Sequence, residues 1–461
     1  MKRVLFFLVC ITGLLCLLAA PAFAGPKTIY VPPSNKDDTA AIQNAFNQAG
    51  RGGTVQLGPY HYYTNTILAK NFDGYFRGSG EGRTTVDCLR GLDPSRPGMT
   101  VMPGYYYTFL LGFDGGNVKI SDLSCDVTPT APGDWSNNGT PADYLMEDVF
   151  VTGNASSAFD HVAFIAGSGS DSGSNTDEGI VVMGNLPPSC LTSGVENICD
   201  CSFTGMPDGI QTLGLTDGQA TITGNVFHDS DFSVMADDTS ASQVTISHNQ
   251  MTAANWDDIV LWQGYQADAG LGPLPSLPAP RFVISDNRML GTGSAGGVAV
   301  TDSSPLYGAP NRLYAVIADN DIRLDNGGYD GGIDGIYAQG VQVLCNHIWG
   351  TGLAGIDVGA LASLVGLPSA PDNGWQIIGN DVSGVTATGD QYGVSTAQIL
   401  LGPDASHCLV VGGPRPTSVL DQGTHDILVN VTRLPLPAAP AAALSPVPNM
   451  VPKVGFSRLR P

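Results

Sequence analysis

A short segment recurs seven times from Val195 onward, and this repeat constrains the fold more than any other feature of the chain. Each copy reads as a strand, a turn residue that is usually Asn, an apolar pair and a second strand. The turn residues of the first three copies, Cys201, Asn225 and Asn249, are 24 residues apart. A period in the twenties, with strand-like pieces and no helix in each copy, is typical of a solenoid in which each repeat forms one turn of a coil.

The repeat also predicts which side chains face the inside of the coil and which form a corner. Alternate apolar residues such as Ile222, Phe227, Ile246 and Met251 are predicted to point inward and to stack on the turns above and below. Asn tolerates left-handed turn geometry, and its amide can bond to a copy one turn away. The Asn residues predicted to form this corner are Asn225, Asn249, Asn287, Asn320, Asn346 and Asn380.

The stretch "NKDDTAAIQNAFNQAGRGGTVQLGPYHYYT", residues 35–64, reads as one short helix that runs into a strand. Asp37 or Asp38 is expected to cap the first turn, and Gly50 is expected to end the helix. A coil of strands has an open apolar end that would attract another chain, so the helix is predicted to plug it. Its predicted apolar face consists of Ala41, Ile42, Ala45, Phe46 and Ala49.

The repeat and the N-terminal stretch resemble the pectin-lyase-like superfamily of right-handed parallel β-helix proteins, which includes pectate lyases, polygalacturonases, epimerases and phage tailspikes. The resemblance is carried by Asp37-Asp38-Thr39, the following "AAIQNAF", "GGTVQL" from Gly52 and "FRGSGEGRTTVDC" from Phe76, and it spans about residues 28–431. It implies an all-β chain folded as a right-handed parallel β-helix with an N-terminal capping helix. A fold of this kind leaves the activity class open.

The two ends of the chain differ in composition from the repeats. A basic start, a short apolar run and "AFA" at residues 22–24 predict a secretory signal peptide over residues 1–24. Residues 25–75 are predicted to form the cap, with a helix at about 38–49, and residues 76–431 the coil. Residues 432–461 form a Pro/Ala-rich tail. We therefore expect a secreted, periplasmic or cell-surface protein without a transmembrane segment after signal cleavage.

The charge of the chain limits its partners. The formal net charge is −22, and no Lys or Arg occurs between Lys119 and Arg281. Nucleic acid and anionic membranes are therefore excluded as partners, because both need a cationic surface. A free polyanion such as pectate or alginate would also be repelled unless Ca²⁺ bridged it to the acids. A homotrimer, as in tailspikes, is not indicated, and the cysteines are compatible with disulfides or with plain apolar packing.

Acidic residues recur just before the second strand of several repeats. Since adjacent turns lie about 4.8 Å apart, Asp208, Asp231 and Asp257 are predicted to form a ladder on one external face, with Asp258 beside it. Stacked carboxylates repel, which leaves two outcomes: a raised pKa, suited to a general acid, or a Ca²⁺ ion between them. No other metal or cofactor is predicted. The competing interpretation is that Asp-Gly and Asp-Asp are ordinary turn residues.

A pair of carboxylates two turns apart suits glycoside hydrolysis, because inverting enzymes separate their acids by about 6.5–9.5 Å. Asp208 with Asp257 or Asp258 falls at the upper edge of this range. The side chains expected to contact a sugar are Trp256, Trp262 and Tyr265, as stacking platforms, and His228, which would tune a proton.

Three functions follow, in order of preference. The first is an exported enzyme that cleaves a neutral or weakly charged polysaccharide with paired aspartates, and the second is a non-catalytic β-helix that binds glycans or is structural. The third is a Ca²⁺-dependent uronan lyase or epimerase. The resemblance implies a basic residue for lyase chemistry, and only Arg288, Arg312 or Arg323 is available. "SNTDEG", containing Asp177, resembles the first polygalacturonase motif, but the motifs that should follow it are missing.

Overall fold

The computed structural model describes most of the chain between residues 26 and 436. The described ranges are 26–89, 99–102, 105–128, 143–152, 156–166, 177–183, 192–206, 208–213, 215–230, 232–239, 243–252, 257–264, 280–290, 296–308, 313–325, 331–360, 370–388 and 396–436. The predicted signal peptide and all but the first residues of the predicted tail lie outside these ranges. Within them, no helix is long and apolar enough to cross a membrane.

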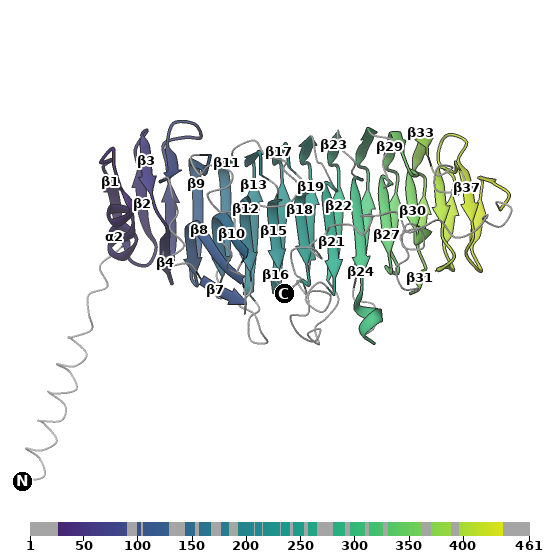
Figure 1. The fold of residues 1–461 in the computed structure, drawn as a ribbon, viewed down its shortest axis with the longest axis horizontal. Coiled ribbons are helices and arrows are strands. Elements are labelled where there is room, and N and C mark those ends of the chain that lie inside the picture. The colour runs from purple at the N-terminus through teal and green to yellow at the C-terminus, as the bar shows by residue number, and fades with distance from the viewer. Residues whose placement is uncertain are drawn as a thin grey trace, which may run out of the picture.

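The described chain winds into a row of stacked turns whose strands run parallel to their neighbours on adjacent turns (Figure 1). Each full turn contributes one strand to a 14-stranded sheet, here sheet B, and two strands to a 23-stranded sheet, here sheet A. Only β7 pairs antiparallel, with β8. Sheet B consists of β4 (Ile67–Lys70), β7 (Met99–Met102), β8 (Tyr105–Asp114), β10 (Asp143–Thr152), β12 (Asp177–Met183), β15 (Asp208–Leu213), β18 (Phe232–Asp237), β21 (Ile259–Gln263), β24 (Val298–Asp302), β27 (Ile333–Ile336), β30 (Ile356–Val358), β34 (Ile399–Leu401), β37 (Ser418–Asp421) and β39 (Thr432–Arg433).

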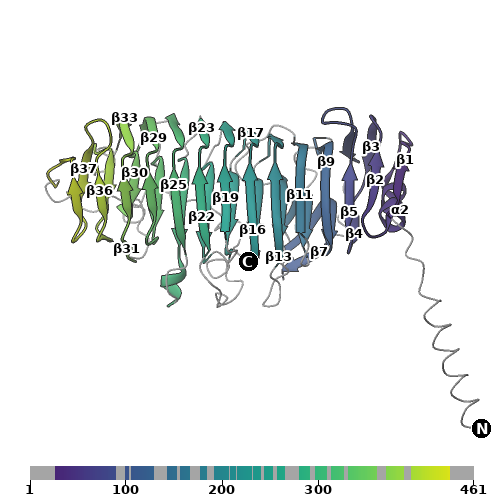
Figure 2. The same cartoon turned by 180° about the vertical axis from the view of Figure 1, so that it is seen from behind.

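Sheet A has two columns, one on each side of the Asn corner. Figure 2 shows the first column from behind, and the short strands of the second column lie along the upper edge in both views. The first column consists of β1 (Thr28–Val31), β2 (Gly53–Leu57), β5 (Gly74–Arg77), β9 (Asn117–Asp126), β11 (Ser156–Ile165), β13 (Thr192–Cys199), β16 (Leu215–Thr223), β19 (Gln243–Ser247), β22 (Arg281–Ser285), β25 (Tyr314–Ala318), β28 (Gln342–Leu344), β32 (Gln376–Ile378), β36 (Leu409–Val411) and β38 (Ile427–Val429). The second column consists of β3 (His61–Thr64), β6 (Thr85–Cys88), the later halves of β9 and β11, β14 (Ser202–Thr204), β17 (Val226–His228), β20 (Gln250–Thr252), β23 (Arg288–Leu290), β26 (Asp321–Asp325), β29 (His347–Gly352) and β33 (Asp381–Ala387).

Three short elements lie outside the two large sheets. The strands β31 (Asp372–Asn373) and β35 (Ala405–Ser406) pair with each other, and a 3-10 helix spans Ser304–Tyr307. The α-helix α2 (Thr39–Ala49) lies at the N-terminal end of the coil (Figure 1). Phe46 of this helix contacts the rings of Phe72, Phe76 and Phe113, with centroids 4.9, 5.1 and 5.8 Å apart. The helix therefore covers the apolar end of the coil.

The capping details partly differ from the prediction. Asp37 Oδ1 accepts a hydrogen bond from the N–H of Thr39, at 2.9 Å, whereas Asp38 accepts from Ser34 and Tyr63 and makes no side-chain cap. The predicted apolar face is confirmed except for Ala41, which is exposed because it lies on the side of the helix turned away from the coil. Gly50 ends the helix with φ +70°, a backbone conformation that glycine adopts without strain.

The predicted Asn corner is confirmed. Each amide donates to the carbonyl oxygen of the next Asn, from Asn225 to Asn249 at 3.0 Å through to Asn346 to Asn380 at 3.0 Å. The left-handed residue is the one before each Asn rather than the Asn itself, and its φ is +58° at His248 and +56° at Asp286. This offset leaves the Asn side chain buried and directed along the coil, where every amide group finds a partner.

The predicted core is also confirmed. Ile222, Phe227, Ile246 and Met251 are all completely buried, and Phe227 stacks on Phe203 one turn away at 4.6 Å between centroids. Cys125, Cys201 and Cys408 belong to the same apolar cluster. The core fills the inside of the coil over its whole described length, so functional side chains have to lie on the outside of the sheets.

Candidate functional site

The outer face of sheet B carries a track of buried acids. In β21 the side chains of Ile259 and Leu261 enter the central core by strand alternation. Asp258 comes one residue before β21, level with Gly297, where a built methyl group would lie 2.6 Å from the core residue Ile322, so Asp258 is directed toward the inside of the coil. The same alternation places the other acids of this sheet outside, because their neighbours Ala236, Ile333 and Ile356 are core residues. Asp257 belongs to this outer surface, because its Oδ1 and Asp334 Oδ2 both lie beside Gly296. We call the surface, together with Asp258 beneath it, the acid face, and it contains Asp237, Asp257, Asp258, Asp334 and Asp357.

Asp257 and Asp258 are adjacent and differ in exposure. Asp258 is 1% exposed and accepts a hydrogen bond from Ser233 Oγ at 3.4 Å, and burial together with the charge of Asp257 raises its pKa to about 8. Asp257 is partly exposed, but its Oδ1 is buried and has no hydrogen-bond partner among the described residues. Burial raises the pKa of Asp257 to about 6, although a backbone hydrogen bond from Gly296 lowers it in part. A solvent-facing acid thus stands in front of a buried neutral one.

Asp257 meets a third carboxyl group across a glycine. A methyl group built on Gly296 would lie 2.8 Å from Asp257 Oδ1 and 3.2 Å from Asp334 Oδ2. Asp334 is held in place by the N–H of Gly331, which lies 3.0 and 2.8 Å from its two oxygens. Gly296 therefore provides the space in which the two carboxyl groups approach each other, although they belong to turns that are two steps apart. This arrangement offers two acids to one reacting group.

The predicted ladder is interrupted on the turn between Asp208 and Asp257, although these two residues lie two turns apart as predicted. Asp208 begins β15, is 3% exposed rather than external, and pairs with Phe232 on the next turn. Phe232 thus stands between Asp208 and the turn that carries Asp257, and Asp231 lies outside the described residues. In the other direction the backbone of Asp208 pairs with Glu178, which pairs with Glu147. Acids do recur on successive turns, but toward the N-terminus.

Asp237 extends the acid face at the end of β18. Its Oδ2 accepts a hydrogen bond from Gln211 Nε2 at 3.0 Å. Complete burial raises its pKa well above the usual range, and the nearby charges of Asp238 and Asp208 add to this effect against the Gln211 hydrogen bond. Asp357 on β30 pairs in register with Asp334 and accepts from the N–H of Ala360 at 2.9 Å. The acids therefore continue along several turns of the coil.

The predicted sugar-binding side chains do not gather at these acids. Trp262 is 5% exposed and packs with Phe232, Met235 and Val260, so it forms a wall of the acid face and not an open platform. His228 lies on the second column of sheet A, since it belongs to β17 and the turn after β17 separates it from sheet B. Its Nδ1 is 3.0 Å from Thr252 Oγ1. Trp256 and Tyr265 lie outside the described residues.

Two of the candidate bases also lie elsewhere. Arg288 and Arg323 belong to β23 and β26 of the second column of sheet A, and Arg312 lies outside the described residues. Asp334 also lies beside the apolar residues of its second strand, two residues before Ile336, but the spacing in the sequence does not indicate that it meets Asp257. Within the described ranges, one group of possible metal ligands lies together, namely Asp160, His161 and Asp200, whose ligand atoms are within 4.8 Å of one another. This exposed group sits near the corner of sheet A and not on the acid face.

No family model matches the chain, and no curated protein is similar to it in sequence. Several solved structures are similar in fold. A mutant of the periplasmic alginate epimerase AlgG superimposes with a TM-score of 0.50 at 12% identity, over 84% of this chain and 84% of that one. The Dettilon tailspike protein gives a TM-score of 0.53 at 12% identity, over 87% of this chain and 68% of that one. The Family 28 exopolygalacturonase of Yersinia enterocolitica gives 0.45 at 13% identity, over 91% and 80%.

The similarities to the alginate epimerase and the tailspike, together with the parallel sheets of the coil, agree with the fold predicted from the repeat and the N-terminal helix. The chain has the right-handed parallel β-helix fold of pectin-lyase-like proteins.

Proposed function

We propose that the protein hydrolyses a glycosidic bond of a polysaccharide on the acid face, with Asp257 as proton donor and Asp334 as the second carboxylate. The observation that carries the proposal is the approach of these two carboxyl groups across Gly296. Glycoside hydrolysis needs one carboxyl group that stays protonated and one that is ionised, placed on either side of the bond. Successive turns with parallel strands repeat this surface along the coil, as a polymeric substrate requires.

The environments of the two acids favour different roles. Burial raises the pKa of Asp257 to about 6, so a useful fraction of it is protonated near neutral pH. Asp334 faces Asp257 across Gly296, and the N–H of Gly331 lies 3.0 and 2.8 Å from its two oxygens, which fixes its orientation. Asp257 would protonate the leaving oxygen while Asp334 takes the proton from the attacking water or forms the bond to the sugar itself.

Asp258 has a supporting role in this scheme. It is directed toward the inside of the coil and away from a substrate, and with a pKa of about 8 it is mostly neutral at pH 7. A second full negative charge next to Asp257 would hold the proton on Asp257 more tightly. A neutral Asp258 lets Asp257 release its proton at a moderate pKa. We assign no catalytic role to Asp208, since Phe232 separates it from the turn of Asp257.

A neutral or weakly charged polysaccharide is the expected substrate class, because the formal net charge of −22 repels a polyanion. A lyase or an epimerase would need a base beside the acids, and the candidate bases Arg288 and Arg323 lie on the second column of sheet A. An alginate epimerase does have a similar fold, but at 12% identity that similarity extends to the fold alone.

The test is a panel of neutral and uronic-acid polysaccharides assayed in parallel for reducing ends and for absorbance of unsaturated products. We expect reducing ends without unsaturated products on a neutral member, and loss of this activity in Asp257→Asn and in Asp334→Asn. Asp286→Asn is the matched control, because Asp286 is an exposed acid at a left-handed corner position that Asn tolerates. Unsaturated products, or full activity in both variants, would refute the proposal.

A further inference from the structure

A second polar surface lies on the outside of sheet A, across four successive turns of its second column. The backbone register aligns Arg288 with Asp321, Asp321 with His347 and His347 with Asp381. Two residues farther along the strands, Arg323 is aligned with Trp349. We call this surface the arginine–tryptophan face, and it contains Arg288, Asp321, Arg323, His347, Trp349, Asp381, Ser383 and Arg415.

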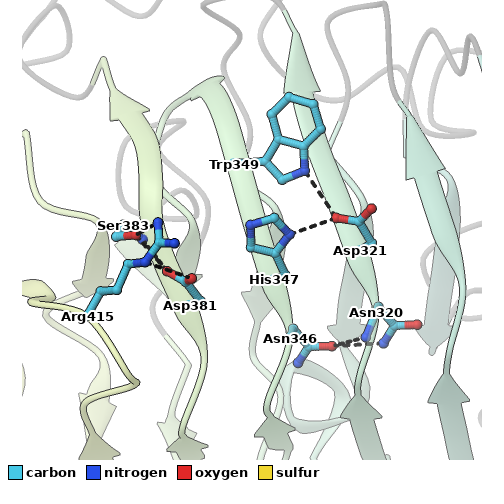
Figure 3. Close-up of polar contacts among 8 residues, drawn as sticks. All are labelled: Asn320, Asp321, Asn346, His347, Trp349, Asp381, Ser383 and Arg415. Carbon is cyan, nitrogen blue, oxygen red and sulfur yellow. Dashed lines mark hydrogen bonds and ion pairs between the residues drawn. The ribbon is translucent and has the colours of Figure 1, made fainter.

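One carboxylate orients both rings of this face. Asp321 Oδ1 lies 2.9 Å from His347 Nδ1 and accepts a hydrogen bond from Trp349 Nε1 at 3.1 Å, as Figure 3 shows. The two rings lie one above the other along β29, with centroids 6.4 Å apart and planes inclined by 24°. Gly384 on the next turn keeps room for the indole, since a methyl group there would lie 2.8 Å from Trp349 Cβ. The rings are therefore held in a fixed arrangement on the surface.

The arginines flank these rings and stay accessible. The guanidinium of Arg323 lies 5.2 Å from the centre of the Trp349 ring and donates to Asp325 at 3.0 Å. Arg415 contacts Asp381 at 3.6 Å and Ser383 Oγ at 3.4 Å (Figure 3). The side chain of Arg323 is 39% exposed and that of Arg415 67%. Exposed ion pairs contribute only about 0–1 kcal/mol, so a ligand carboxylate can compete for these guanidinium groups.

The charge pattern of the chain makes this face unusual. Only four Lys or Arg residues occur between residues 282 and 432, and three of them, Arg288, Arg323 and Arg415, lie here. Its acids are engaged within the face: Asp321 by the two rings, and Asp381 by Ser383 and Arg415. The pKa of Asp381 is lowered, because the Ser383 hydrogen bonds and the charges of Arg415 and His347 outweigh burial, which opposes them.

We propose that the arginine–tryptophan face is a binding surface for a polysaccharide that carries carboxylate groups, separate from the acid face. The flat ring of Trp349 suits the C–H face of a pyranose, and an aromatic ring with a polar edge suits such an amphipathic ligand. Each guanidinium presents five N–H donors in a planar fork that matches a carboxylate. A uronate residue presents both features, a pyranose ring and a carboxylate, at neighbouring positions.

The proposal concerns binding alone and does not depend on hydrolysis at the acid face. It is tested in the full chain with Asp257→Asn as background, so that turnover does not remove the ligand. Native gels that contain polygalacturonate, alginate or a neutral glucan measure retention, with EDTA present to exclude Ca²⁺ bridging. We expect retention by a uronate polymer that weakens as salt rises, and at least a ten-fold loss of affinity in Trp349→Ala and in the double variant Arg323→Gln, Arg415→Gln.

Arg281→Gln is the matched control, because Arg281 is exposed and lies on the first column of sheet A, away from this face. It should bind like the background protein, and thermal melts of all variants check that they fold. Three results would overturn the proposal: undiminished binding by the folded Trp349 and arginine variants, equal retention on the neutral glucan, or an equal loss in the Arg281 control. None of them bears on the hydrolysis assay, which is scored on the acid face.

Discussion

The acid face and the arginine–tryptophan face lie on different sheets of the same coil and handle charge in opposite ways. On the acid face burial dominates, which raises the pKa of Asp258 to about 8 and leaves several carboxyl groups close to one another. On the arginine–tryptophan face the acids are paired and more exposed, and the pKa of Asp381 is lowered. Buried like charges suit proton transfer, and exposed compensated charges suit reversible contact with a ligand.

Two glycines provide the sharpest way to separate the faces. In Gly296→Val a side chain would enter the space between Asp257 and Asp334, with its first carbon 2.8 and 3.2 Å from their oxygens. We expect hydrolysis to fall at least about 100-fold, the usual effect of losing general acid catalysis, while uronate binding is retained. In Gly384→Val the first side-chain carbon would lie 2.8 Å from Trp349 Cβ. This variant should lose uronate binding and keep hydrolysis.

The measurement is a crossed pair of assays on both variants, reducing ends for the acid face and gel retention for the other. If both variants lost both functions to the same degree, the two faces would not be independent. A melting curve for each variant separates these local effects from a general loss of folding, since overpacking costs about 1–3 kcal/mol.

The second prediction concerns the corner on which both faces depend. Asn320→Ala should destabilise the coil by about 2–3 kcal/mol, because it leaves neighbouring amides without their buried partners. Asp321 follows directly, so uronate binding should weaken as well. Chemical denaturation followed by circular dichroism measures the loss. The exposed neighbour Asp319→Asn is the control, since it keeps a residue that accepts φ +55°. A loss no larger in the Ala variant than in this control would contradict the role given to the Asn corner.

Much of the fold follows from the sequence because six successive turns, from Asn225 to Asn380, have the same Asn corner. The 24-residue spacing fixes which residues enter the core, and Phe227 and Met251 lie where that spacing places them. The acid stack failed because the turn between β17 and β18 aligns Phe232, and not Asp231, with Asp208. The prediction that His228 lies beside the acids was wrong for a related reason. His228 ends β17 on sheet A, before the chain turns to β18 on sheet B.

The arginine–tryptophan face escaped notice because loop insertions vary the spacing between its members. Consecutive corner Asn residues are 33, 26 and 34 residues apart from Asn287 to Asn380. The signal that identifies the face is position relative to the corner: Arg288, Asp321, His347 and Asp381 each directly follow an Asn of the ladder. Alignment on the Asn, and not on residue number, would have placed these outward side chains in one row.

The third prediction uses the pKa values of the acid face. The folded pKa of Asp258, about 8, lies above its ordinary value of about 4, so between these pH values the folded protein binds a proton that the unfolded chain lacks. Stability should therefore fall as pH rises from about 4 to 8. Asp257, with a pKa of about 6, adds to the fall over the lower part of this range. In Asp258→Asn the free energy of unfolding should depend less on pH. At pH 8 it should exceed that of the unsubstituted protein by on the order of 3 kcal/mol.

Melting temperatures from pH 4 to 9 test this prediction. The Ser233 hydroxyl can still hydrogen-bond an amide at residue 258, so the variant keeps its packing. An unchanged slope in the variant would mean that Asp258 is ionised in the folded protein, and the distinction between the two faces would then rest on geometry alone.

The smallest expected effect belongs to the exposed face. The folded pKa of Asp381 lies below its ordinary value, so its contribution is present above about pH 4 and is lost as pH falls through the folded pKa. Asp381→Asn should destabilise the protein by less than about 1 kcal/mol at pH 7, because its partner Arg415 is well exposed, and this difference should shrink as the pH falls below about 4. Added salt should shrink the difference at pH 7. A loss as large as the shift in Asp258→Asn would show that this face is as desolvated as the acid face, and exchange of its ion pairs for a ligand carboxylate would then be costly.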